Sequence, residues 1–148
     1  MIQRIQSIFL FASLCFTAPL LFVSVAELTY ETGEIFTFSL SGFYHEGELV
    51  NKQWSMMLFG ILICALNLII ILMYKSRVLQ MRLCIYNMLF LIGLTGIILF
   101  VVYNVQNIES VSFRLPATFP VVSAILHYLA FRGIRKDEMM VQALSRLR

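Results

Sequence analysis

The stretch "WSMMLFGILICALNLIIILMY", residues 54–74, decides the fold class of this chain. It contains no Lys, Arg, Asp or Glu. A helix needs about 20 mainly apolar residues to cross roughly 30 Å of hydrocarbon. Each charge at the centre of such a helix costs roughly 2.5–3.5 kcal/mol on insertion scales. A run of this length without charges is hard to explain in a soluble core, so it predicts a membrane-spanning helix.

Three further apolar runs accompany the first in a chain of 148 residues. The hydrophobic fraction of 60% and the mean hydropathy of +0.87 exceed those of soluble proteins, which are about 45–50% apolar. The fourth run is the weakest, because its apolar core stops at Phe131. We expect an all-α membrane protein, a four-transmembrane-helix bundle, with residues 1–148 forming a single membrane domain. The expected spans are about 5–25, 54–74, 83–105 and 116–134.

The basic residues predict how the chain is threaded. Nine of the eleven Lys and Arg residues lie at the N-terminus, between the second and third runs, or from Arg132 onward, at and beyond the end of the fourth run. The loop of residues 26–53 instead carries five Glu against one Lys. By the positive-inside rule, both termini are cytoplasmic and this loop is periplasmic, in a multi-pass protein of the bacterial inner (cytoplasmic) membrane. The net charge of +3 is normal for such a protein and gives no indication of a nucleic-acid partner.

The periplasmic loop contains a strand pattern. Phe36, Phe38 and Leu40 alternate with Thr and Ser residues, and Gly33 separates this run from an upstream apolar segment. We expect a small periplasmic β-hairpin. Because a lone hairpin is marginally stable in water, it should lie on the helix ends or the lipid headgroups.

The end of the chain, residues 135–148, is basic and has apolar residues at helical spacing. Gly133 is a plausible break after the last span, so we expect a short cytoplasmic amphipathic helix. This tail either lies on anionic lipid of the bilayer or docks on a cytoplasmic partner. The hairpin either covers the helix ends or docks on another envelope protein, so we expect a protein partner in the inner membrane or envelope. Its candidate docking residues are Arg135, Lys136, Met140, Leu144, Leu147 and Arg148.

Polar side chains inside the predicted spans form a candidate site. At about 1.5 Å per residue, four of them fall at similar heights in the cytoplasmic half of the membrane. A bundle would bring them together, either as structural hydrogen bonds between spans or as a small-molecule or quinone pocket. These residues are Gln6, Asn67, Asn87 and His127.

The sequence lacks the patterns of an enzyme or a cofactor protein. It contains no G-x-S-x-G, H-E-x-x-H, P-loop or G-x-G-x-x-G motif. The three cysteines all lie in apolar runs without a C-x-x-C pair, which argues against a disulfide framework or a zinc site. Gly60, Gly93 and Gly96 permit close helix contact, although no G-x-x-x-G is present. We therefore expect no enzyme, cofactor or metal.

The two ends, "MIQRIQSIFLF" and "RGIRKDEMMVQALSRLR", resemble a Bacteroidetes family of small four-span membrane proteins known only as a domain of unknown function. The resemblance implies a four-span inner-membrane protein and brings no activity, cofactor or catalytic residue. One alternative stays open for the N-terminus. Residues 24–26, "SVA", resemble a signal-peptidase site, and residues 1–26 would then be removed.

These observations favour a non-enzymatic accessory or scaffold component of the inner membrane that acts through protein contacts. The alternative is a small-molecule or quinone-binding membrane protein that uses the intramembrane Asn and His residues.

Overall fold

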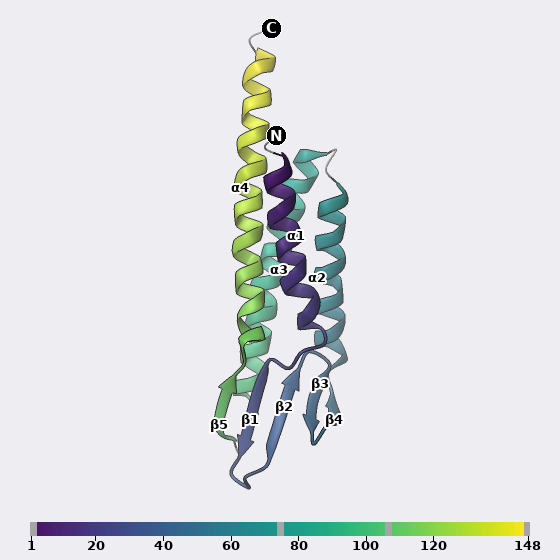
Figure 1. Ribbon diagram of the computed structural model, residues 1–148, viewed down its shortest axis with the longest axis vertical. Coiled ribbons are helices and arrows are strands. Elements are labelled where there is room, and N and C mark those ends of the chain that lie inside the picture. Colours follow the sequence, from purple (N-terminus) through teal and green to yellow (C-terminus); the bar gives the residue numbers. More distant parts are fainter. Residues whose placement is uncertain (1–2, 74–75, 106–107, 147–148) are drawn as a thin grey trace.

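The structure is a computed structural model with four helices side by side and a β-sheet at one end of them (Figure 1). It describes the backbone of residues 3–73, 76–105 and 108–146. Side chains in these ranges are described except for those of residues 3–6, 142 and 144–146. Both ends of the chain lie at the end of the helices that is opposite the sheet.

Four helices make up the larger part of the fold. They are α1 (Gln3–Leu20), α2 (Trp54–Leu72), α3 (Arg77–Tyr103) and α4 (Phe119–Arg146), with a short 3-10 turn η1 (Leu115–Thr118) before α4. The helix α4 has 28 residues and continues well past the other three, away from the sheet (Figure 1). At about 1.5 Å per residue, it is roughly 42 Å long.

The helices pack along seams in which every third or fourth residue is buried. This spacing places buried side chains on one stripe of each helix, as in coiled-coil packing. Several seam positions hold small or polar residues, whereas the large apolar residues between them are exposed. The buried stripe of α3 consists of Gln80, Cys84, Asn87, Leu91, Leu94, Ile98 and Val102.

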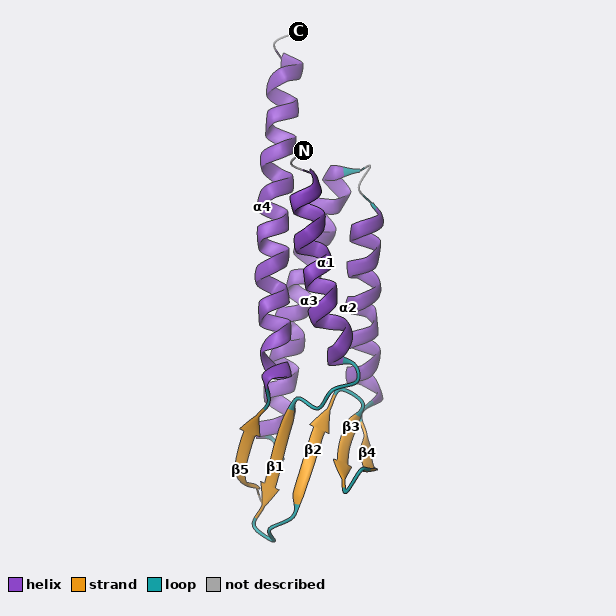
Figure 2. Cartoon of the chain, in the orientation of Figure 1, coloured by secondary structure: helices purple, strands orange, loops and turns teal. Residues whose placement is uncertain are grey.

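The outer surface of the helices suits lipid rather than water. Three helical segments are long and apolar enough to cross a membrane, and they are Trp54–Leu72, Arg77–Tyr103 and Leu115–Val141. Three of the exposed aromatic residues lie where the helices meet the sheet: Phe22 is 84% exposed, Trp54 59% and Tyr103 71%. Aromatic residues are enriched at the membrane–water interface. The chain therefore carries the apolar helices of a membrane protein, and the sheet lies at one end of them (Figure 2).

The sheet has five antiparallel strands in the order β4-β3-β2-β1-β5. The strands are β1 (Ala26–Tyr30), β2 (Ile35–Ser39), β3 (Gly42–His45), β4 (Glu48–Lys52) and β5 (Ile108–Phe113). Tight turns explain the short connections: Gly33 has φ +82° between β1 and β2, and Glu46 and Gly47 have φ 50° and 88° between β3 and β4. Two successive positive φ values are typical of the hairpin turn that matches strand twist.

The sheet and the helices share one apolar core. The buried residues Ala26, Leu28 and Phe38 of the sheet belong to the same cluster as Met56 of α2 and Val102 of α3. The connection before α4 is fixed by Arg114, whose backbone N–H donates to Val25 O at 2.9 Å. Its guanidinium also donates to Ser24 Oγ and forms a salt bridge with Glu27.

The predicted all-α fold was wrong. The expected hairpin is present as β1 and β2, but it is part of a five-stranded sheet. Its outer strand β5 comes from the connection between α3 and α4, about 80 residues further along the chain. Two strands alone are marginal in water, and the additional strands stabilise them.

The predicted spans also need correction. Three helices, rather than four, meet the length and composition of a membrane span in the described part of the chain, and α1 contributes a shorter apolar helix, Ser7–Leu20. The expected break at Gly133 does not occur, because α4 runs through it without interruption. The residues expected to form a separate amphipathic helix are therefore part of the end of α4. This end extends beyond the other helices (Figure 1).

Candidate functional site: a buried polar centre

Five polar side chains meet between the four helices, and we call them the polar centre: Ser13, Asn67, Asn87, Ser123 and His127. All five are 0% exposed. Each helix contributes to the polar centre, because Ser13 lies on α1, Asn67 on α2 and Asn87 on α3, with the remaining two on α4. Each also lies on the buried stripe of its helix, so the packing that excludes lipid also brings them together.

His127 is the hub of the polar centre. Its Nδ1 lies 2.9 Å from Ser123 O and 3.0 Å from Ser13 Oγ. A carbonyl oxygen only accepts hydrogen bonds, so Nδ1 carries the proton and donates it. In the neutral ring, Nε2 is then an acceptor, and Asn87 Nδ2 donates to it at 2.8 Å. The arrangement thus fixes the tautomer and the orientation of the imidazole.

Ser13 extends the network from His127 to α2. Its Oγ accepts a hydrogen bond from Asn67 Nδ2 at 3.3 Å. The backbone carbonyl of Ser13 accepts two further bonds, from Thr17 Oγ1 at 3.0 Å and from Ser123 Oγ at 3.3 Å. Ser13 and its backbone therefore link α1 to both α2 and α4 within one turn of helix.

Two acceptors of the polar centre have no hydrogen-bond partner among the residues that the structure describes. These are Asn67 Oδ1 and Asn87 Oδ1, and both atoms are buried. The amide nitrogens point into the network and leave the oxygens outside it. A buried polar atom without a partner costs about 1–3 kcal/mol. The two oxygens are consequently the positions at which a hydrogen-bond donor, such as water or a hydroxyl group, would be most strongly favoured.

The structure brings three of the four candidate residues together, namely Asn67, Asn87 and His127. The side chain of the fourth, Gln6, lies outside the described residues. Ser13 and Ser123 were not predicted from the sequence, because a single serine in an apolar helix does not indicate a site by itself. The available signal was spacing: Ser123 lies one helical turn before His127, and Ser13 shares a stripe with the buried Leu10, Thr17 and Leu20.

The candidate docking tail is only partly described. Arg135, Lys136 and Met140 are exposed on the last turns of α4. The side chains of Leu144, Leu147 and Arg148 lie outside the described residues. Among the side chains described at this end, the large apolar residues Met139, Met140 and Val141 are 55%, 42% and 48% exposed.

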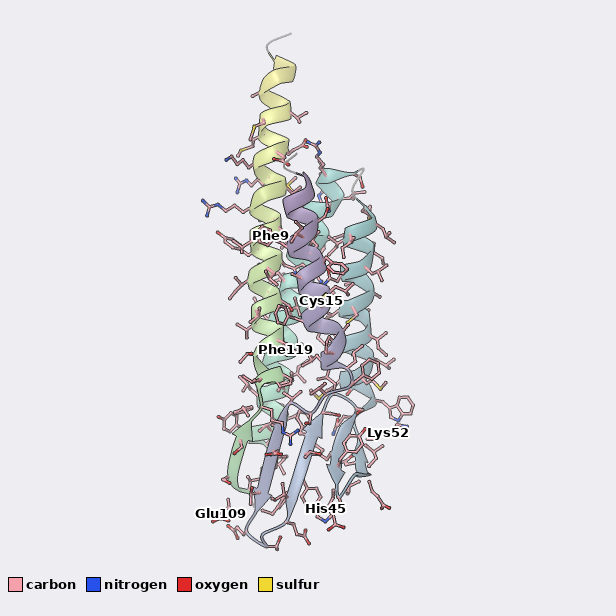
Figure 3. The ribbon with its side chains drawn as sticks, viewed as in Figure 1. Phe9, Cys15, His45, Lys52, Glu109 and Phe119 are labelled. Carbon is pink, nitrogen blue, oxygen red and sulfur yellow. The ribbon has the colours of Figure 1, made fainter. Side chains whose placement is uncertain are left out.

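The chemistry available to the polar centre is limited. It contains amides, hydroxyls and one imidazole, and no carboxylate. Among the described residues, no group of three or more His, Cys, Asp or Glu is placed to hold a metal ion. The other histidine, His45, lies on the sheet (Figure 3), where its ring stacks on Phe36 at 4.4 Å and its Nδ1 lies 3.3 Å from Ile35 O.

The sequence model of one family, the domain of unknown function DUF4293, matches residues 2–147. The chain belongs to this family. The match covers nearly the whole chain, so the helices and the sheet together make up the DUF4293 domain. Among curated proteins, no relative matches the chain. The features of this DUF4293 protein that bear on its function are the polar centre, the sheet and the end of α4.

Proposed function

We propose that this DUF4293 protein is a non-enzymatic scaffold of the bacterial inner membrane, which acts by contact through the end of α4. The main observation in support is that α4 continues past the other helices and has three consecutive exposed apolar residues there, Met139 to Val141. The segment Leu115–Val141 is roughly 40 Å long at about 1.5 Å per residue, more than the roughly 30 Å hydrocarbon core, so its last residues reach beyond the apolar layer. Met139, Met140 and Val141 are spaced about 100° apart around the helix, and a protein partner that encloses the end of α4 would cover all three.

The charges support an orientation for this scaffold. The sheet end carries six Glu residues against Lys52 and Arg114, for a net charge of −4. The opposite end carries five Lys and Arg residues with described side chains against Asp137 and Glu138, for a net charge of +3. By the positive-inside rule, the sheet lies in the periplasm, and both termini lie in the cytoplasm.

The path of α1 is compatible with this orientation. The helix runs beside α4 for most of its length, with the Phe16 ring 5.4 Å from that of Phe119 near the sheet. Towards the other end, Leu10 belongs to the same buried cluster as Ala130 and Ile134. The polar centre then holds the helices in one arrangement, so that the sheet and the projecting end of α4 are rigidly connected.

A photo-cross-linking amino acid at Met140 tests this proposal in cells that naturally make the protein. We expect a discrete cross-linked product of higher mass at this position. The matched control places the same group at Ile61, which is 44% exposed on the apolar surface of α2 and should cross-link to lipid only. If Met140 gives no protein product, or the same product as Ile61, the scaffold proposal is wrong.

A deletion completes the test. Removal of residues 139–148 leaves the buried Ile134 and Asp137 in place, so the fold should survive. We expect the truncated protein to accumulate in the membrane normally and to lose its cellular role. Retention of that role would contradict a function that depends on the end of α4.

A second candidate function is favoured by the two unpartnered amide oxygens of the polar centre. A small molecule with hydroxyl groups, such as a reduced quinone, would supply the donors that Asn67 and Asn87 lack. Replacing Asn67 and His127 with Leu separates the two readings. A scaffold should keep its Met140 cross-link in this variant, whereas a ligand-binding protein should lose its activity at unchanged expression.

A further inference from the structure

The surface between α3 and α4 contains an apolar pocket with a volume of about 550 Å³, which we call the α3–α4 pocket. It extends along α3 from Met88 to Gly96, which is about 12 Å at 1.5 Å per residue. Its other wall is formed by α4, where Val121, Ile125 and Tyr128 line it. An apolar lining accepts any apolar occupant, so the residues at the mouth of the pocket decide which one binds.

Two arginines of α4 continue the wall of the α3–α4 pocket. Val121, Ile125 and Tyr128 are spaced by four and then three residues, and Arg132 and Arg135 follow at the same spacing. Residues at this spacing lie on one stripe of a helix. Both arginines are exposed. The stripe therefore changes from apolar to basic within one helical turn, between Tyr128 and Arg132.

A third arginine lies at the same height on α3. Asn87 of α3 and His127 of α4 are level with one another, because a 2.8 Å hydrogen bond joins their side chains. The two helices run in opposite directions (Figure 1). Arg82, five residues before Asn87, and Arg132, five residues after His127, are therefore both about 7.5 Å from that pair, on the side away from the sheet. Arg82 is exposed as well.

Arg82 and Arg132 are the first charged residues beyond the apolar part of each helix. No Lys, Arg, Asp or Glu occurs in residues 83–105 or 115–131. Among the described residues, neither arginine forms a salt bridge. The nearest carboxylates along α4, Asp137 and Glu138, each already have an interaction of their own. The two guanidinium groups are thus placed to bind an anion from outside the chain, at the edge of the apolar layer.

The height of the arginines above the pocket matches one leaflet of a bilayer. Arg132 lies 11 residues beyond Val121, which is about 16.5 Å along the helix. One leaflet supplies half of the roughly 30 Å hydrocarbon core. A phospholipid with its phosphate at Arg82 and Arg132 would therefore lay an acyl chain along the α3–α4 pocket. Guanidinium groups suit this phosphate, because they bind its oxygens in pairs.

The same arginines argue against a second copy of the chain in this pocket. Copies inserted in the same direction have Arg82, Arg132 and Arg135 at the same height. Packing one pocket against the other would bring three of these charges from each copy together, and like charges repel. A zwitterionic lipid would add an ammonium group beside them, whereas an anionic lipid adds only negative charge.

We propose that the α3–α4 pocket binds one acyl chain of an anionic phospholipid, whose phosphate is held by Arg82, Arg132 and Arg135 at the mouth of the pocket. A lipid that is held at both its head and its chain should stay bound when the protein is extracted in a mild detergent. The proposal does not depend on a protein partner at the end of α4.

Native mass spectrometry of the full chain in mild detergent tests the proposal. Dioleoyl phosphatidylglycerol and dioleoyl phosphatidylcholine are the two probes, since they share their acyl chains and differ in net charge. We expect one phosphatidylglycerol per chain, bound at least about tenfold more tightly than phosphatidylcholine. R82Q and R132Q should each weaken phosphatidylglycerol binding roughly fivefold. The control K52Q removes an exposed charge at the sheet end and should change neither lipid.

A matched pair of glycine variants tests the pocket itself. A Cβ atom added to Gly96 or to Gly93 would meet nothing within 4 Å, but only Gly96 is among the residues that line the pocket. G96L should therefore weaken phosphatidylglycerol binding, whereas G93L should leave it unchanged. The charge variants keep the test decisive if G96L fails to fold.

Four results would overturn the proposal. They are equal binding of the two lipids, equal effects of G96L and G93L when both fold, displacement of the lipid by excess inorganic phosphate, and a dimer of the chain that contains no lipid. The third result would mean that the arginines bind phosphate without the pocket. The fourth would mean that a second copy covers the pocket.

Discussion

The substitution Ser13→Ala tests the polar centre most sharply, because it removes a single oxygen on which two helices depend. Ala fits the space of Ser, so no cavity forms. The loss takes away the acceptor of Asn67 Nδ2 and one of the two acceptors of His127 Nδ1. The imidazole keeps its bond to Ser123 O, but the Asn67 amide then has no partner at either end.

The magnitude follows from these contacts. Hydrogen bonds between membrane helices average about 0.6 kcal/mol, and the 3.3 Å bond from Asn67 is a long one. The Asn67 amide nitrogen, which loses its acceptor, adds the cost of an unsatisfied buried group, about 1–3 kcal/mol. We expect Ser13→Ala to lower the free energy of unfolding by about 2 kcal/mol. Asn67→Leu should cost far less, because it also removes the unpartnered Oδ1.

A double-mutant cycle in mixed detergent micelles measures this difference. Ser13→Ala should cost about 2 kcal/mol in the natural chain, and less than about 1 kcal/mol once Asn67 is already Leu. The unfolding free energy is followed by tryptophan fluorescence, since the chain has a single Trp. An equal cost of Ser13→Ala in the two backgrounds would refute the hydrogen-bond network as described.

Three further substitutions test the junction between the helices and the sheet. Gly42→Ala should unfold the sheet, at a cost of about 3 kcal/mol or more, because Gly42 has φ +145° and its Cβ would lie 2.1 Å from Asn51 O. Protease digestion measures this unfolding of the sheet, and a variant whose sheet stays resistant to the protease would contradict the strand register. Gly60→Ala should cost only about 1 kcal/mol, since the two leucine tips it meets can shift, and a thermal melt in detergent checks this. Arg114→Ala should cost about 1 kcal/mol or less in the same melt, because its salt bridge with Glu27 is partly exposed and screened by water.

The membrane character and the polar centre could be predicted from the sequence because both depend on local signals. An apolar run without charges predicts a membrane helix, and counting residues along such a helix gives the depth of Asn67, Asn87 and His127. Polar side chains in lipid are expected to face other helices, which is where the structure places these three. Their hydrogen-bond partners Ser13 and Ser123 could not be predicted, because this requires the rotation of each helix about its axis.

The size of the sheet could not be predicted for a different reason. The strand β5 pairs with β1 across about 80 residues of chain, and nothing within the sequence "IESVSF" indicates its partner. The hairpin of β3 and β4 turns at Glu46-Gly47, and Glu-Gly is not among the residue pairs that predict a two-residue turn. Gly133 was misleading, because a single glycine weakens a helix by only about 1 kcal/mol, which the adjacent buried Ile134 can offset.

The central claim is that the sheet and the projecting end of α4 lie on opposite sides of one membrane. Cysteines introduced one at a time at Glu46 and at Met140, in a C15A and C64A variant that retains the buried Cys84, test it with a thiol reagent that cannot cross the inner membrane. In cells with a permeable outer envelope, the account predicts labelling at position 46 at once, and at position 140 only after the inner membrane is opened. Labelling of both positions in intact cells, or of position 140 alone, would contradict it.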